Sequence, residues 1–126
     1  MAVIDKRINI FPGDTLAIAF ECRKPDTLDP LEYQRGQPVT PDSAYVRVKD
    51  QDDVWFELGG VGIEEAPMTI VPQTGNTYSD TGAIIKYTLP AIWTLVPGNY
   101  TIFATATFSD GLIRTEDKKF RVLEFR

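Results

Sequence analysis

Histidine is absent from this sequence of 126 residues, and cysteine occurs once. The chain therefore lacks the commonest general base, the commonest transition-metal ligand and the usual partner of serine and cysteine nucleophiles. None of its three serines, Ser43, Ser79 and Ser109, stands in the Gly-x-Ser-x-Gly pattern of hydrolases. The adjacent acids Glu64 and Glu65 would point to opposite sides of a strand, so they do not suggest a catalytic carboxylate pair. We therefore expect no enzymatic activity.

A single cysteine cannot form a disulfide within the chain. Cys22 ends an alternating apolar run that begins at Leu16, and this position predicts a small apolar side chain that faces the interior. A reactive thiol is the alternative, since Arg23 and Lys24 follow in the sequence and a nearby cation can lower the pKa of a thiol.

Positive charge and long apolar runs are both scarce. The formal net charge is -5, whereas binding to a nucleic-acid backbone requires a basic surface. No apolar stretch approaches the roughly 20 residues that cross a bilayer, and residues 1–7 lack the basic-then-apolar order of a secretory signal. We expect a chain made in the cytoplasm without a signal peptide, with neither nucleic acid nor a membrane as a partner.

The sequence does not indicate a cofactor or a metal. The glycines at 59–62 are not followed by the lysine and hydroxyl residue of a phosphate-binding loop. Asp50, Asp52 and Asp53 place three carboxylates in one turn, but their surroundings depart from the calcium loop of an EF-hand. We interpret this turn as a solvated hairpin turn, with calcium binding as the alternative.

Alternation of apolar and polar residues dominates the sequence and predicts strands with one buried face. The clearest hairpin opens at Pro97-Gly98-Asn99-Tyr100 and returns through Phe120 and Val122, with Asp110-Gly111 as a tight turn in which both residues can adopt a positive φ. A second hairpin is expected from 44–49 and 54–58 around the aspartate turn. The remaining expected elements are strands over 3–10, 15–23, 68–71 and 83–89, and a helical turn over 90–96.

Clusters of glycine, proline and aspartate separate these segments, and no stretch has the pattern of a long amphipathic helix. The sequence therefore predicts an all-β, antiparallel, immunoglobulin-like β-sandwich of about seven to nine strands, folded as a single domain over residues 1–126. The proline-rich connection Lys24–Ser43 is either a crossover between the sheets or a segment that contacts a partner. The N-terminal segment, about 1–11, is a candidate assembly arm that pairs with the sheet edge of a neighbouring subunit.

Several short motifs carry a resemblance to a known family. They are Pro12-Gly13-Asp14-Thr15, Ala44-Tyr45-Val46-Arg47-Val48, Pro97-Gly98-Asn99-Tyr100, Asp110-Gly111 and Phe120-Arg121-Val122. In this order they resemble the immunoglobulin-like domains of tailed-phage virion proteins, including the N-terminal domain of the baseplate upper protein and the domains of capsid decoration and neck proteins. The resemblance implies a tyrosine corner, in which the Tyr100 hydroxyl bonds back to the main chain.

The resemblance also implies a non-enzymatic virion protein that docks on other virion proteins of the capsid, neck or tail and is present in many copies. A capsid decoration or neck position is preferred over the baseplate. The alternative is an adhesion module that binds a host-surface polysaccharide through exposed aromatic side chains, with Trp93 and Tyr78 as candidates. Of the adjacent pair Trp55 and Phe56, which point opposite ways on a strand, we expect at least one in the core. The candidate interface residues are Val3, Ile4, Ile8, Ile10, Tyr33, Tyr78 and Trp93.

Overall fold

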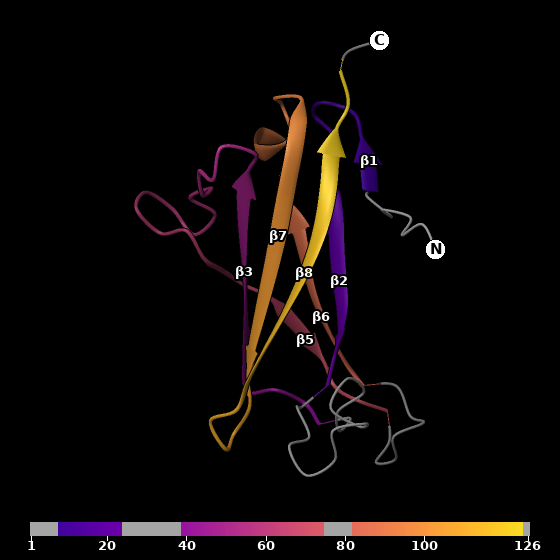
Figure 1. The fold of residues 1–126 in the computed structure, drawn as a ribbon. Coiled ribbons are helices and arrows are strands. Elements are labelled where there is room, and N and C mark those ends of the chain that lie inside the picture. The colour runs from indigo at the N-terminus through magenta and orange to yellow at the C-terminus, as the bar shows by residue number, and fades with distance from the viewer. Residues whose placement is uncertain (1–7, 24–38, 75–81, 125–126) are drawn as a thin grey trace, which may run out of the picture.

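The chain is described by a computed structural model over residues 8–23, 39–74 and 82–124, and its strands form two sheets packed face to face (Figure 1). The elements in chain order are β1 (Ile8–Ile10), β2 (Leu16–Cys22), β3 (Ser43–Asp50), β4 (Ala66–Pro67), β5 (Thr69–Val71), β6 (Ala83–Leu89), the 3-10 helix η1 (Ala91–Trp93), β7 (Gly98–Thr107) and β8 (Ile113–Val122). The predicted strands over 15–23 and 83–89 and the predicted helical turn after Pro90 are confirmed.

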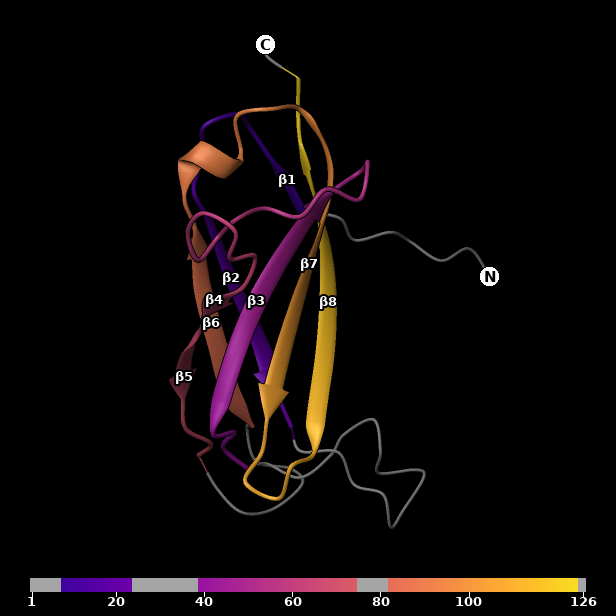
Figure 2. The same cartoon turned by 90° about the vertical axis from the view of Figure 1, so that its left-hand side faces the viewer.

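One sheet has five strands in the order β1-β8-β7-β3-β4, and the other has three in the order β2-β6-β5 (Figure 2). Neighbouring strands are antiparallel except for β1, which runs parallel to β8. The run β8-β7-β3-β4 opposite β2-β6-β5 follows the order of the G-F-C-C′ and B-E-D strands of immunoglobulin-type domains. The predicted all-β sandwich is confirmed.

The core follows directly from the alternating sequence pattern. Every second residue of β2, β3 and β7 is buried, and these side chains meet between the two sheets, together with Phe120 and Val122 of β8. Cys22 has no exposed surface, and burial raises the pKa of its thiol to about 11. This confirms the interior position that the alternation predicted and argues against a reactive thiol.

The β7–β8 hairpin is confirmed, but its turn is wider than predicted. The N–H of Phe108 donates to the carbonyl of Leu112 over 2.9 Å, and the N–H of Gly111 donates to the carbonyl of Phe108 over 2.9 Å. Gly111 has the predicted positive φ, 87°. Asp110 does not, because Asp53 is the only residue other than glycine with a positive φ in the described part of the chain. Asp110 instead accepts the N–H of Leu112 through its side chain, and this bond stabilises a longer loop.

The predicted second hairpin is confirmed next to its turn, but its returning segment forms no regular strand. The N–H of Asp50 donates to the carbonyl of Val54 over 3.0 Å, the N–H of Phe56 donates to the carbonyl of Val48 over 2.8 Å, and Trp55 forms an isolated antiparallel bridge with Lys49. A turn between Gly59 and Ile63 then leads the chain away, and the short strand β4 pairs with β3 farther along, at Tyr45 and Val46. Pairing is brief because the segment that returns ends at this glycine turn.

Tyr100 forms the expected tyrosine corner. Its hydroxyl donates to the carbonyl of Val96, four residues upstream, while its ring stacks on Phe120 with centroids 4.9 Å apart. Burial raises the pKa of Tyr100, so the hydroxyl stays protonated and remains a donor at neutral pH. The entry into β7 is therefore fixed both by packing and by a hydrogen bond.

Candidate functional site

The described surface has hollows, but their linings do not resemble catalytic centres. One hollow of about 510 Å³ lies between Gln51, the start of β7 and the end of β8, and Glu124 is the one acid that lines it. A second of about 340 Å³ is lined by Glu64 and Glu65, and Glu64 lies 3.6 Å from Arg47. The two glutamates lie in a loop and not in a strand, so the expectation that they point apart, which assumed a strand, does not apply to them.

The aspartate turn after β3 uses its carboxylates to hold its own shape. One oxygen of Asp50 accepts the N–H groups of Asp52 and Val54 over 2.9 and 3.0 Å, and Asp53 pairs with Lys49 over 2.9 Å. Within residues 8–23, 39–74 and 82–124, no three acidic, cysteine or histidine side chains gather as a metal site would require. The turn thus has the organisation of a hydrogen-bonded hairpin turn.

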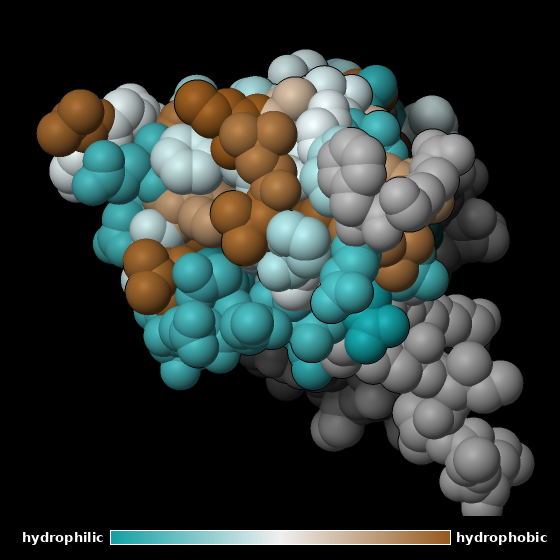
Figure 3. All heavy atoms as spheres, turned by 90° about the horizontal axis from the view of Figure 1, so that it is seen from above, coloured by the Kyte–Doolittle hydropathy of each residue, from teal (hydrophilic) through white to brown (hydrophobic). Residues whose placement is uncertain are grey.

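One end of the sandwich gathers large apolar side chains at the surface. Phe11 is 37% exposed, and Ile92, Leu95 and Val96 are 69%, 57% and 67% exposed. Figure 3, which views this end of the molecule, shows hydrophobic side chains clustered over it. We call these four residues the apolar end. Contiguous exposed apolar surface on a small domain commonly marks a contact with another molecule.

Two loops distant in the sequence build the apolar end. Phe11 lies in the turn between β1 and β2, and the other three residues lie in and after η1. The N–H of Gly13 donates to the carbonyl of Thr94 over 3.1 Å, and the hydroxyl of Thr94 donates to the carbonyl of Asp14 over 2.6 Å. Thr94 itself has no exposed surface, and its two bonds hold the loops together.

Acidic side chains border the apolar end. Asp14 is exposed in the same turn as Phe11 and accepts the N–H of Phe11 over 2.9 Å. On the other side, Asp52 is exposed and lines a small hollow together with Val96. The surface is therefore apolar with an acidic border, in keeping with the net charge of -5.

Three of the seven candidate interface residues, Ile8, Ile10 and Trp93, lie in the described part of the chain. Val3, Ile4, Tyr33 and Tyr78 lie outside the described residues, as do 24–38 of the proline-rich connection. Ile8 and Ile10 pair with Phe120 and Val122 of the chain's own β8, and Ile8 remains 38% exposed while Ile10 packs against the core. Trp93 is half-buried and stacks on Phe56 with ring centroids 4.9 Å apart.

The two tryptophans of the chain are each covered on one face by a neighbouring side chain. Phe56 covers Trp93, and the guanidinium of Arg47 lies 3.8 Å from the ring centre of Trp55. Phe103 also contacts Trp55, with centroids 5.5 Å apart. Both Phe56 and Trp55 are partly buried, and Phe56 packs against the core without belonging to its fully buried residues.

Sequence reasoning missed the four residues of the apolar end. A signal was present, because the run Ala91–Val96 between two prolines is too short for a helix and far more apolar than a solvated loop. The sequence favours Trp93 as the interface residue of this run because of its size, yet its neighbours Ile92 and Leu95 are the exposed residues.

No helix in the described part of the chain is long and apolar enough to cross a membrane. In comparisons with known proteins, no family model, no curated protein and no solved structure matches the chain.

Proposed function

We propose that this chain is a non-enzymatic structural protein of a tailed-phage particle that docks on other virion proteins of the capsid, neck or tail. The apolar end is the observation that carries the proposal. Four large apolar side chains stand at the surface on two loops that are tied together by a buried threonine. A rigid apolar surface loses little conformational entropy when it is covered, and this property suits a permanent docking contact.

The acidic border favours a partner different from this chain. Asp14 and Asp52 lie beside the apolar residues, so two copies meeting end to end would bring like charges together. The complementary surface is an apolar patch with lysine or arginine around it. A virion protein that repeats by symmetry would offer this patch many times, and the chain would then be present in many copies.

A competing proposal is adhesion to a host-surface polysaccharide through exposed aromatic rings. Sugar-binding platforms need a ring face open to the ligand, and each tryptophan offers at most one, because Phe56 covers one face of Trp93, Arg47 covers one face of Trp55, and both rings are partly buried. We therefore favour docking, and a glycan array with the purified chain gives the discriminating measurement: saturable binding to one class of sugar would support adhesion.

The test uses particles from the phage genome that encodes the chain, with the gene deleted and supplied in trans. The wild type is compared with Ile92→Asp, which places a charge on the apolar end, and with Val61→Asp as the matched control. Val61 is 96% exposed in the glycine loop before β4, so the control adds the same charge elsewhere. Both variants should melt near the wild-type temperature, because neither side chain is buried.

We expect the wild type and Val61→Asp to co-purify with particles at a fixed copy number, and Ile92→Asp to be reduced by about tenfold or more, equivalent to at least ~1.4 kcal/mol. Absence of the wild type from particles would overturn the virion role. Normal incorporation of Ile92→Asp would instead overturn the assignment of the apolar end as the docking surface while leaving the virion role in place.

A further inference from the structure

Strand β2 has an open edge. All seven of its residues pair with β6, from Leu16 opposite Leu89 to Cys22 opposite Ala83, and no described strand pairs with its other side. In an antiparallel strand, alternate residues direct their N–H and C=O groups to opposite neighbours. The carbonyl of Ala19 accepts a bond from the ammonium of Lys118 on β8, so it points away from β6. By alternation, Ala17 and Glu21 also direct their main-chain groups to the open side.

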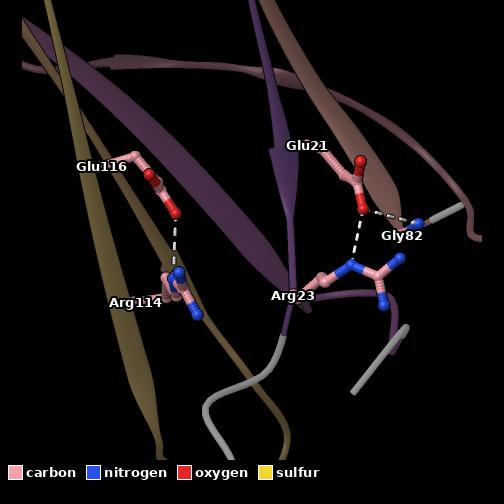
Figure 4. Close-up of polar contacts among 5 residues, drawn as sticks. All are labelled: Glu21, Arg23, Gly82, Arg114 and Glu116. Atoms are coloured by element: carbon pink, nitrogen blue, oxygen red, sulfur yellow. Dashed lines mark hydrogen bonds and ion pairs between the residues drawn. The ribbon is translucent and has the colours of Figure 1, made fainter. Parts of the chain in front are cut away.

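The inner face of β8 lies beyond this edge. Phe120 and Val122 cover the core, but the next residues along the same face are Lys118, Glu116 and Arg114. Figure 4 shows Arg114 and Glu116 between β8 and β2. Charged side chains occupy these inward positions because the three-stranded sheet ends at β2, so no described strand lies opposite this part of β8. Inward-pointing charges are a recognised means of protecting a strand edge from unspecific pairing.

The charges along this edge are not evenly balanced. Arg114 pairs with Glu116 over 2.9 Å, and Arg23 pairs with Glu21 over 2.5 Å (Figure 4). The Arg23 guanidinium beside Glu21 lowers the pKa of that carboxyl, so Glu21 is ionised at pH 7. The ammonium of Lys118, in contrast, donates to the Ala19 carbonyl over 2.6 Å and lies 4.6 Å from the ring centre of Phe20. No carboxylate in the described part of the chain pairs with it.

We propose that the open edge of β2 accepts an extended segment of a partner protein that carries an acidic residue level with Ala19. The N–H of the incoming strand would donate to the Ala19 carbonyl, and its carboxylate would take up the Lys118 ammonium displaced from that carbonyl. The exposed side chains of Ala17 and Ala19 are small, so they leave room for the neighbouring strand. Strand addition of this kind gains affinity from main-chain bonds and specificity from side chains. It does not depend on the virion role or on the apolar end.

Lys118 gives the edge its selectivity. A strand with a neutral or basic residue at the central position would displace the ammonium from its acceptor without providing another, whereas an acidic residue converts a carbonyl contact into an ion pair. The edge is therefore closed to most extended chains and open to acidic ones.

The experiment is titration of the intact, isotope-labelled chain with the peptide acetyl-Thr-Val-Ser-Glu-Ser-Val-Thr-amide, followed by NMR and amide hydrogen exchange. We expect saturable shifts and slower exchange at the amides of Ala17, Ala19 and Glu21, with the opposite sheet edge at Thr69 and Val71 unchanged. The counterpart peptide with lysine in place of glutamate should bind about tenfold more weakly.

Two variants separate main-chain pairing from charge. Ala19→Pro removes the N–H that faces the open side while the bonds to β6, made by alternate residues, remain. It should abolish binding, and Ala19→Ser, which keeps the N–H, should bind like the wild type. Lys118→Ala should bind the two peptides within about twofold of each other, because the discriminating charge is gone. This variant also tests the proposal if Ala19→Pro fails to fold.

Three outcomes would overturn the proposal. One is the absence of shifts with the glutamate peptide at millimolar concentration. Another is equal binding of both peptides by the wild type. The third is protection of the Ala17, Ala19 and Glu21 amides in the free chain, which would mean that the edge is already covered. Protection that persists on dilution would assign the edge to another segment of the same chain, and protection lost on dilution would assign it to a second copy.

Discussion

Replacing Thr94 with valine tests how the apolar end is held together. Valine has nearly the same shape as threonine but no hydroxyl, so Thr94→Val removes the 2.6 Å bond to the Asp14 carbonyl without opening a cavity. Thr94 has no exposed surface, and the bond that is lost is part-buried. An unsatisfied buried acceptor costs about 1 to 3 kcal/mol.

The expected effect can be stated as a change in melting temperature. For a chain of 126 residues, the entropy of unfolding is about 0.26 kcal/mol/K. A loss of about 1.5 kcal/mol therefore lowers the melting temperature by about 6 °C. Differential scanning calorimetry gives the temperature, and urea unfolding gives the free energy.

The same substitution should loosen the apolar end. Amide exchange of Gly13 should accelerate, because its N–H donates to the carbonyl of residue 94 and depends on the same contact between the loops. Thr88→Val is the matched control, since Thr88 is exposed on β6 and its change should shift the free energy of unfolding by less than about 0.5 kcal/mol. Equal stability of Thr94→Val and the wild type would refute the assignment of Thr94 as the tie between the loops.

Three further predictions concern the core and the loops. Because the pKa of the buried Cys22 thiol is raised, the unfolded chain loses this proton at a lower pH than the folded chain, and the free energy of unfolding should fall by about 2 to 3 kcal/mol between pH 9 and pH 11. Urea unfolding of Cys22→Ala should lack this fall, and the same pH profile for the variant and the wild type would contradict the prediction. Tyr100→Phe should lower the free energy of unfolding by about 1 kcal/mol through loss of the bond to Val96, whereas an unchanged urea midpoint would argue against the tyrosine corner. A Cβ on Gly59 would lie 2.3 Å from a backbone oxygen, while one on Gly62, whose φ is 76°, would meet nothing within 4 Å. Gly59→Ala should therefore be more destabilising than Gly62→Ala by at least ~1 kcal/mol. The reverse order in thermal unfolding would refute the clash.

Local pattern was sufficient for much of the fold. Side chains alternate across a strand regardless of its neighbours, so the inward positions of Val46 and Ile102 and the burial of Cys22 followed from the sequence. The tyrosine corner, which the family resemblance implied, is local as well, because the Tyr100 hydroxyl donates to a carbonyl only four residues upstream. Each of these features depends on residues that are close together in the chain.

The features that concern function depend on distant segments. The two loops of the apolar end meet through a bond between residues 80 positions apart, and the open edge of β2 depends on Lys118, 99 positions from Ala19. The sequence pattern at 54–58 favoured a strand, yet this segment pairs with β3 only next to the turn, and β4 pairs with the rest of that edge at Tyr45 and Val46. The sequence by itself determined which residues face inward, through the two-residue repeat of a strand. The tertiary structure alone decided which surfaces and edges stay uncovered, because exposure is a property of how the whole chain packs.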